Sequence, residues 1–234
     1  GLIRRSPCSR GISINMSKLK VENLGKSYGG NVILENISFT AEAGDSIAFV
    51  SPSGSGKSTL LSMLGLLLSS TTGTVVVDGQ DSDALGDKEL SRLRRETFGF
   101  VFQHTQLVGS LRAVENVMAP ANFAGKLPFD ARERAEQLLG GLGLADRLMH
   151  YPYQLSIGQK RRVSVARALL LDPPIVIADE PTNDLDADSS ASVADTLFER
   201  AANGGILLFA THDRELASRA SRVMHLEGKT FVER

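Results

Sequence analysis

Apolar and polar residues alternate over two stretches near the start of the chain, at 19–28 and 32–43, and Gly29-Gly30-Asn31 separates them. A period of two is typical of strands with one buried face, and the glycine pair is typical of a tight turn. Short runs that are apolar throughout follow at 47–50, 175–178 and 206–210. Such runs indicate strands that are covered on both faces. The pattern therefore predicts an antiparallel strand pair followed by a buried, parallel sheet.

Helices fill the intervals between these strands. Apolar positions three to four residues apart predict helices at 60–68, 84–96, 158–171 and 189–203. Between about 105 and 157, β-branched residues become sparse, and helices are expected at 111–124, 129–142 and 144–149. Further short strands are expected at 74–77 and 98–102, and a short helix with a final pair of strands closes the chain.

Strands that alternate with helices predict an α/β fold. We expect a mostly parallel central sheet, an antiparallel β subdomain and a helical insertion subdomain at about 105–157, all within one domain at 16–234. Residues 1–15 are interpreted as a leader or a remnant without ordered structure, and Met16 is a candidate native start.

Composition narrows the class of protein. The 234 residues carry a net charge of −1, which is unlike the basic footprint of a nucleic-acid-binding protein. The single cysteine, Cys8, provides neither a disulfide framework nor a zinc cluster, and it favours a reducing, cytosolic compartment. No apolar run approaches the ~18 residues that span a bilayer. If the protein works at a membrane, we expect another component to hold it there.

A glycine-rich turn lies between the expected strand at 47–50 and the helix that follows it. It reads Ser51-Pro52-Ser53-Gly54-Ser55-Gly56-Lys57-Ser58-Thr59. Glycines let consecutive N–H groups point inward, and the helix start adds unpaired donors and partial positive charge. We expect Lys57 to reach the β- and γ-phosphates of a nucleotide and the Ser58 hydroxyl to bind Mg²⁺. The alternative is a loop that merely caps the helix.

Ser51 departs from this motif, which normally begins with glycine. If position 51 requires a positive φ, serine would cost on the order of 1–3 kcal/mol. If φ is negative, serine fits without strain. The sequence leaves both possibilities open, but every group that would touch phosphate is present.

Two acids follow the apolar strand at 175–178. A carboxylate at the end of a buried strand requires a partner. Asp179 suits the shell of Mg²⁺, and Glu180 suits orientation of an attacking water. Each acid could instead belong to an ordinary turn. Leu155-Ser156-Ile157-Gly158-Gln159 precedes the helix at 158–171, where Ser156 either caps the helix or presents donors to an anion.

Together these segments resemble an ATP-binding-cassette (ABC) nucleotide-binding domain from about Lys18 to the end of the chain. The motifs stand in the family's order: Tyr28 as the adenine-stacking aromatic, the phosphate loop at 51–59, Gln103 as the Q-loop glutamine, the signature at 155–159, the acidic strand at 175–180, the D-loop at 183–186 and His212 as the switch histidine. Ile157 stands where the family usually has glycine, and we expect it to crowd an interface modestly.

The resemblance implies a P-loop NTPase fold and a Mg²⁺-dependent ATPase. It implies catalytic roles for Lys57, Gln103, Glu180 and His212, and Mg²⁺ ligation by Ser58, Gln103 and Asp179. The residues implied in nucleotide binding are Tyr28, the loop at 51–59, Ser156, Gly158, Gln159 and Asp186. A second copy of the chain would complete each site in a head-to-tail dimer that ATP holds together.

The family also implies a membrane partner. A permease subunit is expected on a separate chain, which places this protein peripherally on the cytoplasmic face of a bacterial inner membrane. Residues 98–104 and 114–117 are similar to the ATPases of lipoprotein-release and macrolide-efflux systems. Alternatives are a dimerisation module that hydrolyses ATP poorly and a cell-division relative that transports nothing. A ribosome-associated or nucleic-acid-binding cassette fits the acidic balance poorly, and a nucleotide kinase would not explain the signature or His212.

Overall fold

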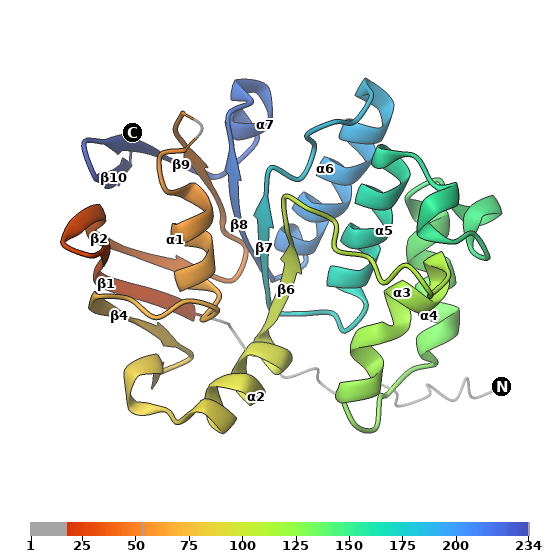
Figure 1. Ribbon diagram of the computed structural model, residues 1–234, viewed down its shortest axis with the longest axis horizontal. Coiled ribbons are helices and arrows are strands. Elements are labelled where there is room, and N and C mark those ends of the chain that lie inside the picture. Colours follow the sequence, from red (N-terminus) through yellow and green to blue (C-terminus); the bar gives the residue numbers. More distant parts are fainter. Residues whose placement is uncertain (1–17, 53, 234) are drawn as a thin grey trace, which may run out of the picture.

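The structure, a computed structural model, describes residues 18–52 and 54–233. The expected leader at 1–15, Met16 and Ser53 of the phosphate loop lie outside the described residues. Figure 1 shows the antiparallel sheet at one side of the molecule, the parallel sheet in the middle and the helices α3–α6 on the other side.

The first sheet is antiparallel and has the strand order β2-β1-β4-β5. Its strands are β1 (Lys18–Tyr28), β2 (Asn31–Glu42), β4 (Thr72–Val77) and β5 (Gln80–Asp81). Tyr28 pairs with Asn31 across the predicted turn, where Gly29 and Gly30 have φ values of 55° and 85°. Two successive positive φ values suit a two-residue hairpin turn. The predicted strand pair is therefore confirmed.

The second sheet is parallel except at one edge, and its order is β10-β9-β3-β8-β7-β6. Its strands are β3 (Ser46–Val50), β6 (Phe98–Val101), β7 (Ile175–Asp179), β8 (Ile206–Thr211), β9 (Arg222–Glu227) and β10 (Thr230–Glu233). Only β10 runs antiparallel to its neighbour among the described strands. The predicted covered, mostly parallel sheet is confirmed.

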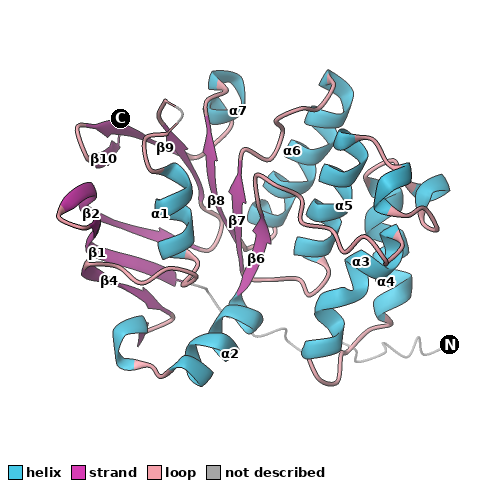
Figure 2. Cartoon of the chain, viewed as in Figure 1, coloured by secondary structure: helices cyan, strands magenta, loops and turns pink. Residues whose placement is uncertain are grey.

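The helices separate into two groups (Figures 1 and 2). Helix α1 (Lys57–Leu64) packs on β7 and β8, on the side that faces the antiparallel sheet. On the opposite side lie α3 (Ala113–Met118), α4 (Ala131–Gly141), α5 (Ile157–Leu169) and α6 (Ala187–Ala202). Helix α2 (Asp87–Thr97) precedes β6, and α7 (Arg214–Ser218) follows β8.

Side chains that alternate between the two faces of the parallel sheet form two hydrophobic cores, one on each face. Ile175 and Ile177 belong to the apolar cluster beneath α1 and the antiparallel sheet, whereas Val176 and Ala178 belong to the cluster under α3–α6. All four side chains are buried. Full burial of an aliphatic side chain contributes about 1.5–3 kcal/mol, so packing on both faces holds β7 firmly in register. The residues that end β7 are positioned by that packing.

The helical region differs from the prediction in two places. The segment at 144–149 contains only a short 3-10 turn, Ala145–Arg147. The N–H of Val114 donates to Leu148 O (3.1 Å) within that segment, and the N–H of Ala113 donates to His150 O (2.8 Å) just after it. These tertiary hydrogen bonds compete with helix formation. The helix expected at 111–124 ends as α3 at Met118 and continues as a 3-10 turn, because Pro120 lacks the N–H that an α-helix requires.

Within the described part of the chain, no helix is both long enough and apolar enough to cross a lipid bilayer. The parallel strands β3, β7 and β8 all end at the same edge of their sheet, because parallel neighbours share one direction. Ligand sites of open α/β sheets lie at the carboxyl edge, and the predicted chemical residues follow these strands.

Candidate functional site

The phosphate loop joins the end of β3 to the first turn of α1. Gly54 and Gly56 have φ values of 78° and 100°, a conformation that side chains disfavour. A Cβ at Gly56 would also lie 3.0 Å from Ile33 Cγ2, so only glycine fits there without displacing a neighbour. The loop shape therefore depends on these two residues.

Ser51 takes the place of the usual first glycine without backbone strain. It is not among the described residues that have positive φ. Its side chain is buried, and its Oγ shares a 2.5 Å hydrogen bond with Ser55 Oγ, which lies 2.6 Å from Pro52 O. The hydroxyl thus links two parts of the loop. Of the two possibilities for Ser51, the unstrained one is correct.

Lys57 is a buried cation, with only 7% of its surface exposed. Its Nζ donates to Ser51 O (2.7 Å) and Pro52 O (3.2 Å) and lies 3.7 Å from Glu180 Oε1. A buried ammonium group needs such partners to offset its lost hydration. The lysine therefore points back into the loop, where an anion would meet both its charge and the surrounding N–H groups.

The two acids at the end of β7 have different partners. Asp179 Oδ2 accepts a 2.5 Å hydrogen bond from Ser58 Oγ. Glu180 is buried, and its Oε2 lies 3.0 Å from Nδ1 of His212, which follows β8. The Glu180 backbone has a φ of 47° and donates its N–H to Ala210 O at 3.0 Å. Glu180 therefore stands between Lys57 and His212.

Burial raises the pKa of Asp179 above its ordinary value of 3.8, and the nearby Glu180 carboxylate raises it further. The hydrogen bond from Ser58 and the positive charges of Lys57 and Arg161 oppose this shift. An acid that is hard to ionise gains from a divalent cation, because the cation stabilises the carboxylate.

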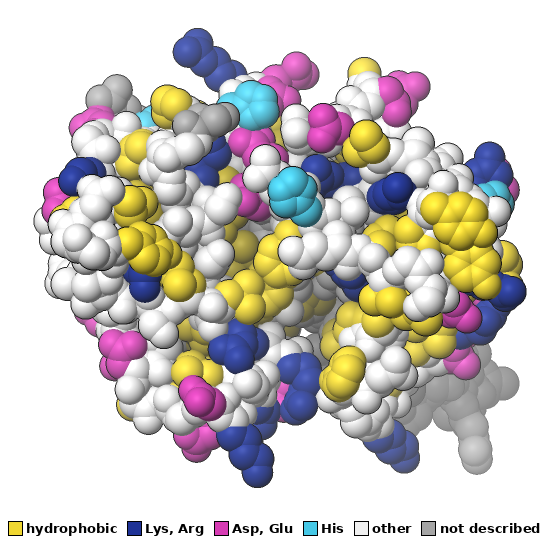
Figure 3. All heavy atoms as spheres, in the orientation of Figure 1, with side chains coloured by type: hydrophobic (Ala, Val, Ile, Leu, Met, Phe, Trp, Pro, Cys, Tyr) yellow, Lys and Arg dark blue, Asp and Glu magenta, His cyan; other side chains and the backbone are white. Residues whose placement is uncertain are grey.

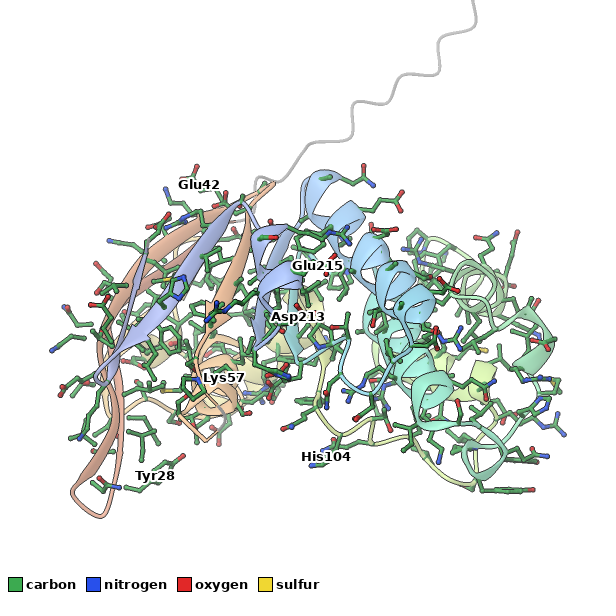
Figure 4. The ribbon with its side chains drawn as sticks, turned by 90° about the horizontal axis from the view of Figure 1, so that it is seen from above. Tyr28, Glu42, Lys57, His104, Asp213 and Glu215 are labelled. Atoms are coloured by element: carbon green, nitrogen blue, oxygen red, sulfur yellow. The ribbon has the colours of Figure 1, made fainter. Side chains whose placement is uncertain are left out.

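An open cavity of about 350 Å³ collects these groups. Its lining comprises Tyr28, Ile33, Gly54, Gly56, Lys57, Ser58, Thr59, Gln103, Asp179 and Glu180. Tyr28 is half exposed at the turn between β1 and β2, and Lys26 Nζ lies 5.1 Å from its ring centre. Figure 4 shows Tyr28 and His104 toward the lower edge of the view, with Lys57 deeper between them. Residues from four distant parts of the sequence thus meet at one cavity.

The predicted nucleotide-binding residues at the starts of α5 and α6 lie outside this cavity. Ser156 caps α5: its Oγ accepts from Gln159 N at 3.2 Å, and its N–H donates to Gln159 Oε1 at 3.0 Å. Asp186 caps α6 through Ser189, and these hydrogen bonds lower its pKa. Gly158 packs beside Leu185. None of these residues lines the cavity that contains Lys57, and Ile157 is 64% exposed beside Ser156.

The donor atoms suit Mg²⁺. Ser58 and Asp179 place a hydroxyl and a carboxylate oxygen in contact, and Gln103 lines the same cavity. No group of three or more His, Cys, Asp or Glu side chains that could hold a metal occurs in the residues that the structure describes. Mg²⁺ usually takes few protein ligands and completes its shell with water and substrate phosphates. The residues present therefore fit that ion together with a nucleotide.

Two residues of this region escaped the sequence interpretation. Ile33 lines the cavity from β2, and Arg161 is a buried cation on α5 whose charge acts on Asp179 and Glu180. Ile33 carries no recognisable signal, because it resembles any strand residue. Arg161 does carry one, since it lies one helical turn from Val165, on a helix face that is otherwise buried and apolar.

Comparison with known proteins agrees with this geometry. The family model described as ABC transporter matches residues 34–183. The lipoprotein-releasing system ATP-binding protein LolD of Aquifex aeolicus (strain VF5) is 42% identical over 216 residues, which are 92% of this chain and 96% of LolD. The macrolide export ATP-binding/permease protein MacB of Shewanella sp. (strain ANA-3) is 45% identical over 200 residues, and this chain spans about 30% of its length.

Solved structures show the same fold. The dimeric structure of a post-hydrolysis state of the ATP-binding cassette MJ0796, bound to ADP and Pi, superposes with a TM-score of 0.86 at 34% identity, over 92% of this chain and 97% of that one. A phosphate loop, a buried strand that ends in two acids and a mostly parallel sheet are together typical of a P-loop nucleoside triphosphatase. This chain belongs to the ABC transporter family and is an ATPase cassette of that family.

The shifted pKa of Asp179 makes a prediction about stability without nucleotide or Mg²⁺. The folded chain binds the Asp179 proton more tightly than the unfolded chain, so stability falls as the pH rises from the unfolded pKa through the folded one. Asp179→Asn removes this penalty. We expect its free energy of unfolding to exceed that of the wild type at about pH 8, with the gain shrinking toward about pH 4.

Urea unfolding in the presence of a chelator measures this difference, and Asp186→Asn is the control of opposite sign. The pKa of Asp186 is lowered, so its stabilisation is present above the unfolded pKa and lost as the pH falls. Asp186→Asn should therefore be less stable than the wild type at about pH 8 and at about pH 4, and should approach it only as the pH falls below the unfolded pKa. An Asp179→Asn protein that is less stable at about pH 8 would contradict the assigned shift.

Proposed function

We propose that the cavity at the ends of β3, β7 and β8 binds Mg²⁺-ATP and hydrolyses it, and that this reaction drives a permease. The observation that carries the proposal is the convergence of Lys57, the Ser58–Asp179 pair and the Glu180–His212 pair on one cavity. These groups are a cation for phosphate, oxygen ligands for Mg²⁺, and a carboxylate that can orient water.

Each residue has a role that its position supports. Bound phosphate replaces the carbonyls of Ser51 and Pro52 as the partner of Lys57 Nζ, while loop N–H groups donate to its oxygens. The Tyr28 ring stacks on the adenine. Mg²⁺, held by Ser58, Gln103 and Asp179, would neutralise phosphate charge.

Glu180 is placed to act on the nucleophile. Its carboxylate accepts a hydrogen bond from the water that attacks the γ-phosphorus, and the bond from that phosphorus to the bridging oxygen of ADP breaks. His212 holds Glu180 through the 3.0 Å contact between Nδ1 and Oε2. Catalysis of this kind depends on position and charge rather than on covalent chemistry.

Two substitutions separate binding from chemistry. Lys57→Ala should abolish ATP binding, because it removes the buried cation that faces phosphate. Glu180→Gln should retain binding and lower phosphate release by about a hundredfold or more, since the amide orients water less well. Titration with a fluorescent ATP analogue and a phosphate-release assay measure the two steps. Lys20→Ala and Glu22→Gln, taken from an exposed ion pair, are the matched controls.

The residues on α5 and α6 require a partner. The Ser156 turn lies outside the Lys57 cavity of its own chain, and the related MJ0796 cassette is described as dimeric. We infer that two copies of this chain pair head to tail, so that Ser156, Gly158 and Gln159 of one copy meet the nucleotide of the other. Asp186 begins α6 beside this turn, since its neighbour Leu185 packs at Gly158.

This inference is tested in the Glu180→Gln protein, where ATP persists. We expect ATP to convert that protein to a dimer, and we expect an added Ser156→Arg change to prevent dimerisation while single chains still bind ATP. Light scattering after gel filtration measures the mass. Ser91→Arg, which introduces the same side chain on α2, should leave the dimer intact. A stable ATP dimer of the Ser156→Arg protein would refute the shared site.

We propose that a permease binds at an apolar cleft of this chain. An apolar cleft of about 380 Å³ opens between α2 and the segment after α3, and Figure 3 shows apolar side chains within this hollow. Its lining includes the apolar residues Leu67, Phe98, Phe100, Pro120 and Phe123 and the basic residues Arg94, Arg95 and Arg167. Leu67 and Phe100 also line the smaller cleft that contains Gln103. A permease segment bound there would lie close to the nucleotide ligand Gln103.

We propose a permease on a separate chain, as the near-complete match to LolD supports, and a peripheral position on the cytoplasmic face of the inner membrane. Phe123, whose side chain is largely exposed, supplies the test. Phe123→Asp should lower the share of the protein that sediments with inner-membrane vesicles severalfold, because a charge would enter an apolar contact. Tyr153→Asp changes an equally exposed aromatic outside the cleft and should have no effect.

A further inference from the structure

Arg161 is a charged residue in a place that normally holds an apolar one. It lies in the second turn of α5, and only 2% of its surface is exposed. Four of the residues that follow it on this helix, Val163, Val165, Ala166 and Leu169, are buried against the core under α3–α6. A guanidinium group stays charged at any physiological pH, so the interior holds a permanent positive charge here.

The Arg161 side chain touches two other segments of the chain. Its Nη1 donates to Phe102 O at 2.9 Å, and Phe102 immediately precedes Gln103. Its Nη2 lies 4.0 Å from Asp184 Oδ2, in the loop between β7 and α6 where Asp184 has a φ of 62°. Helix α5 itself begins at the Ser156 cap. One guanidinium group thus joins three segments, each of which carries residues assigned to ATP binding.

Fold stability alone does not explain this arrangement. The Arg161 Nε atom is buried and has no hydrogen-bond partner in the described residues, and Asp184 is largely exposed. A buried charge with incomplete pairing costs free energy that an apolar side chain of similar size avoids. Burial lowers the pKa of Arg161, while the charges of Asp184, Asp179 and Glu180 oppose that shift. An unpaired buried group of this kind calls for another role.

We propose that Arg161 is a positioning residue that couples the ATP cavity of a chain to the Ser156 turn of the same chain. This inference rests on the proposed function. ATP and Mg²⁺ engage Gln103, and the rigid peptide between Gln103 and Phe102 moves the carbonyl that Arg161 binds. The guanidinium carries that displacement to α5 and to the Asp184 loop. ATP binding in the Lys57 cavity of a chain thereby sets the position of the Ser156 turn that the same chain presents to its partner.

The coupling travels through the hydrogen bond to Phe102, the 4.0 Å ion pair with Asp184 and a packed helix, and contiguous contacts of this kind are the physical means by which sites influence each other. Arg161 acts through Phe102 and Asp184 and touches no reacting atom. Its loss should therefore leave nucleotide binding by single chains intact and weaken the steps that need two chains.

The test compares three substitutions in the full chain. Arg161→Leu should retain the affinity for a fluorescent ATP analogue within about twofold, because Lys57 and the loop remain. Its kcat for phosphate release should fall by about tenfold or more, which corresponds to the loss of one charge-assisted hydrogen bond. Arg161→Lys keeps the charge and one donor and should recover part of this loss, whereas Arg161→Gln should recover less.

Arg162→Leu is the matched control. Arg162 is the next residue of α5, its Nε is also buried without a partner in the described chain, and its Nη1 donates to Leu142 O at 3.0 Å. It contacts a carbonyl just past α4 rather than the Gln103 segment. We expect Arg162→Leu to lower the melting temperature at least as much as Arg161→Leu, with a smaller loss of kcat.

A double-mutant cycle tests the link to Asp184. If both residues belong to one coupling path, the Arg161→Leu/Asp184→Asn protein should lose no more kcat than Arg161→Leu alone. A double variant whose loss of kcat equals the product of the two single losses would contradict the link to Asp184.

Two outcomes would overturn the proposal as a whole. One is an Arg161→Leu protein with wild-type kcat and wild-type ATP-driven dimerisation. The other is an Arg161→Leu protein that no longer binds the ATP analogue as a single chain. Failure of the proposed function would look different, because the wild type would then neither hydrolyse ATP nor dimerise with it.

Discussion

This structure depends on the contacts that the buried ammonium group of Lys57 makes. It joins the carbonyls that follow β3 to the carboxylate of Glu180, which follows β7 and lies 123 residues beyond Lys57 in the sequence. A buried cation is tolerated only when its neighbours compensate for lost hydration. Lys57 and its neighbour Glu180 also line the cavity, so the group that closes the loop is the group that an anion would meet. The strand order of the parallel sheet makes this possible, because β8 alone separates β3 from β7.

Backbone strain also occurs at this place. Gly54 and Gly56 adopt positive φ without penalty, but Glu180 adopts it as an ordinary residue, at a cost on the order of 1–3 kcal/mol. Its N–H bond to Ala210 and its contact with His212 hold it there. Ser51 shows the opposite case, since the conformation of the loop accepts a side chain at a position where the motif has glycine. A side chain that replaces glycine in the motif therefore causes strain only where the backbone φ is positive.

The chain carries two sets of ATP-related residues that do not meet within one molecule. The set around Lys57 forms a cavity, while the Ser156 turn begins a helix that packs on the far face of the sheet. If both sets bind ATP as we propose, the two regions need a connection within the chain. In that proposal helix α5 supplies a mechanical route and the Arg161 guanidinium an electrostatic one, because Arg161 contacts Phe102 and Asp184 and its charge acts on the acids that end β7.

The sequence by itself determined the order of strands and helices, the phosphate loop with Lys57 and Ser58, and the acids at 179 and 180. These features are local: alternation, glycine spacing and a charge at the end of an apolar run are visible in any short window. The segment at 144–149 was predicted as a helix, and only the tertiary structure decided otherwise, through hydrogen bonds from α3. Tertiary structure also decided the sign of φ at Ser51, the contact between Glu180 and His212, and the buried position of Arg161. Each of these depends on which distant strands become neighbours, and no local pattern records that pairing.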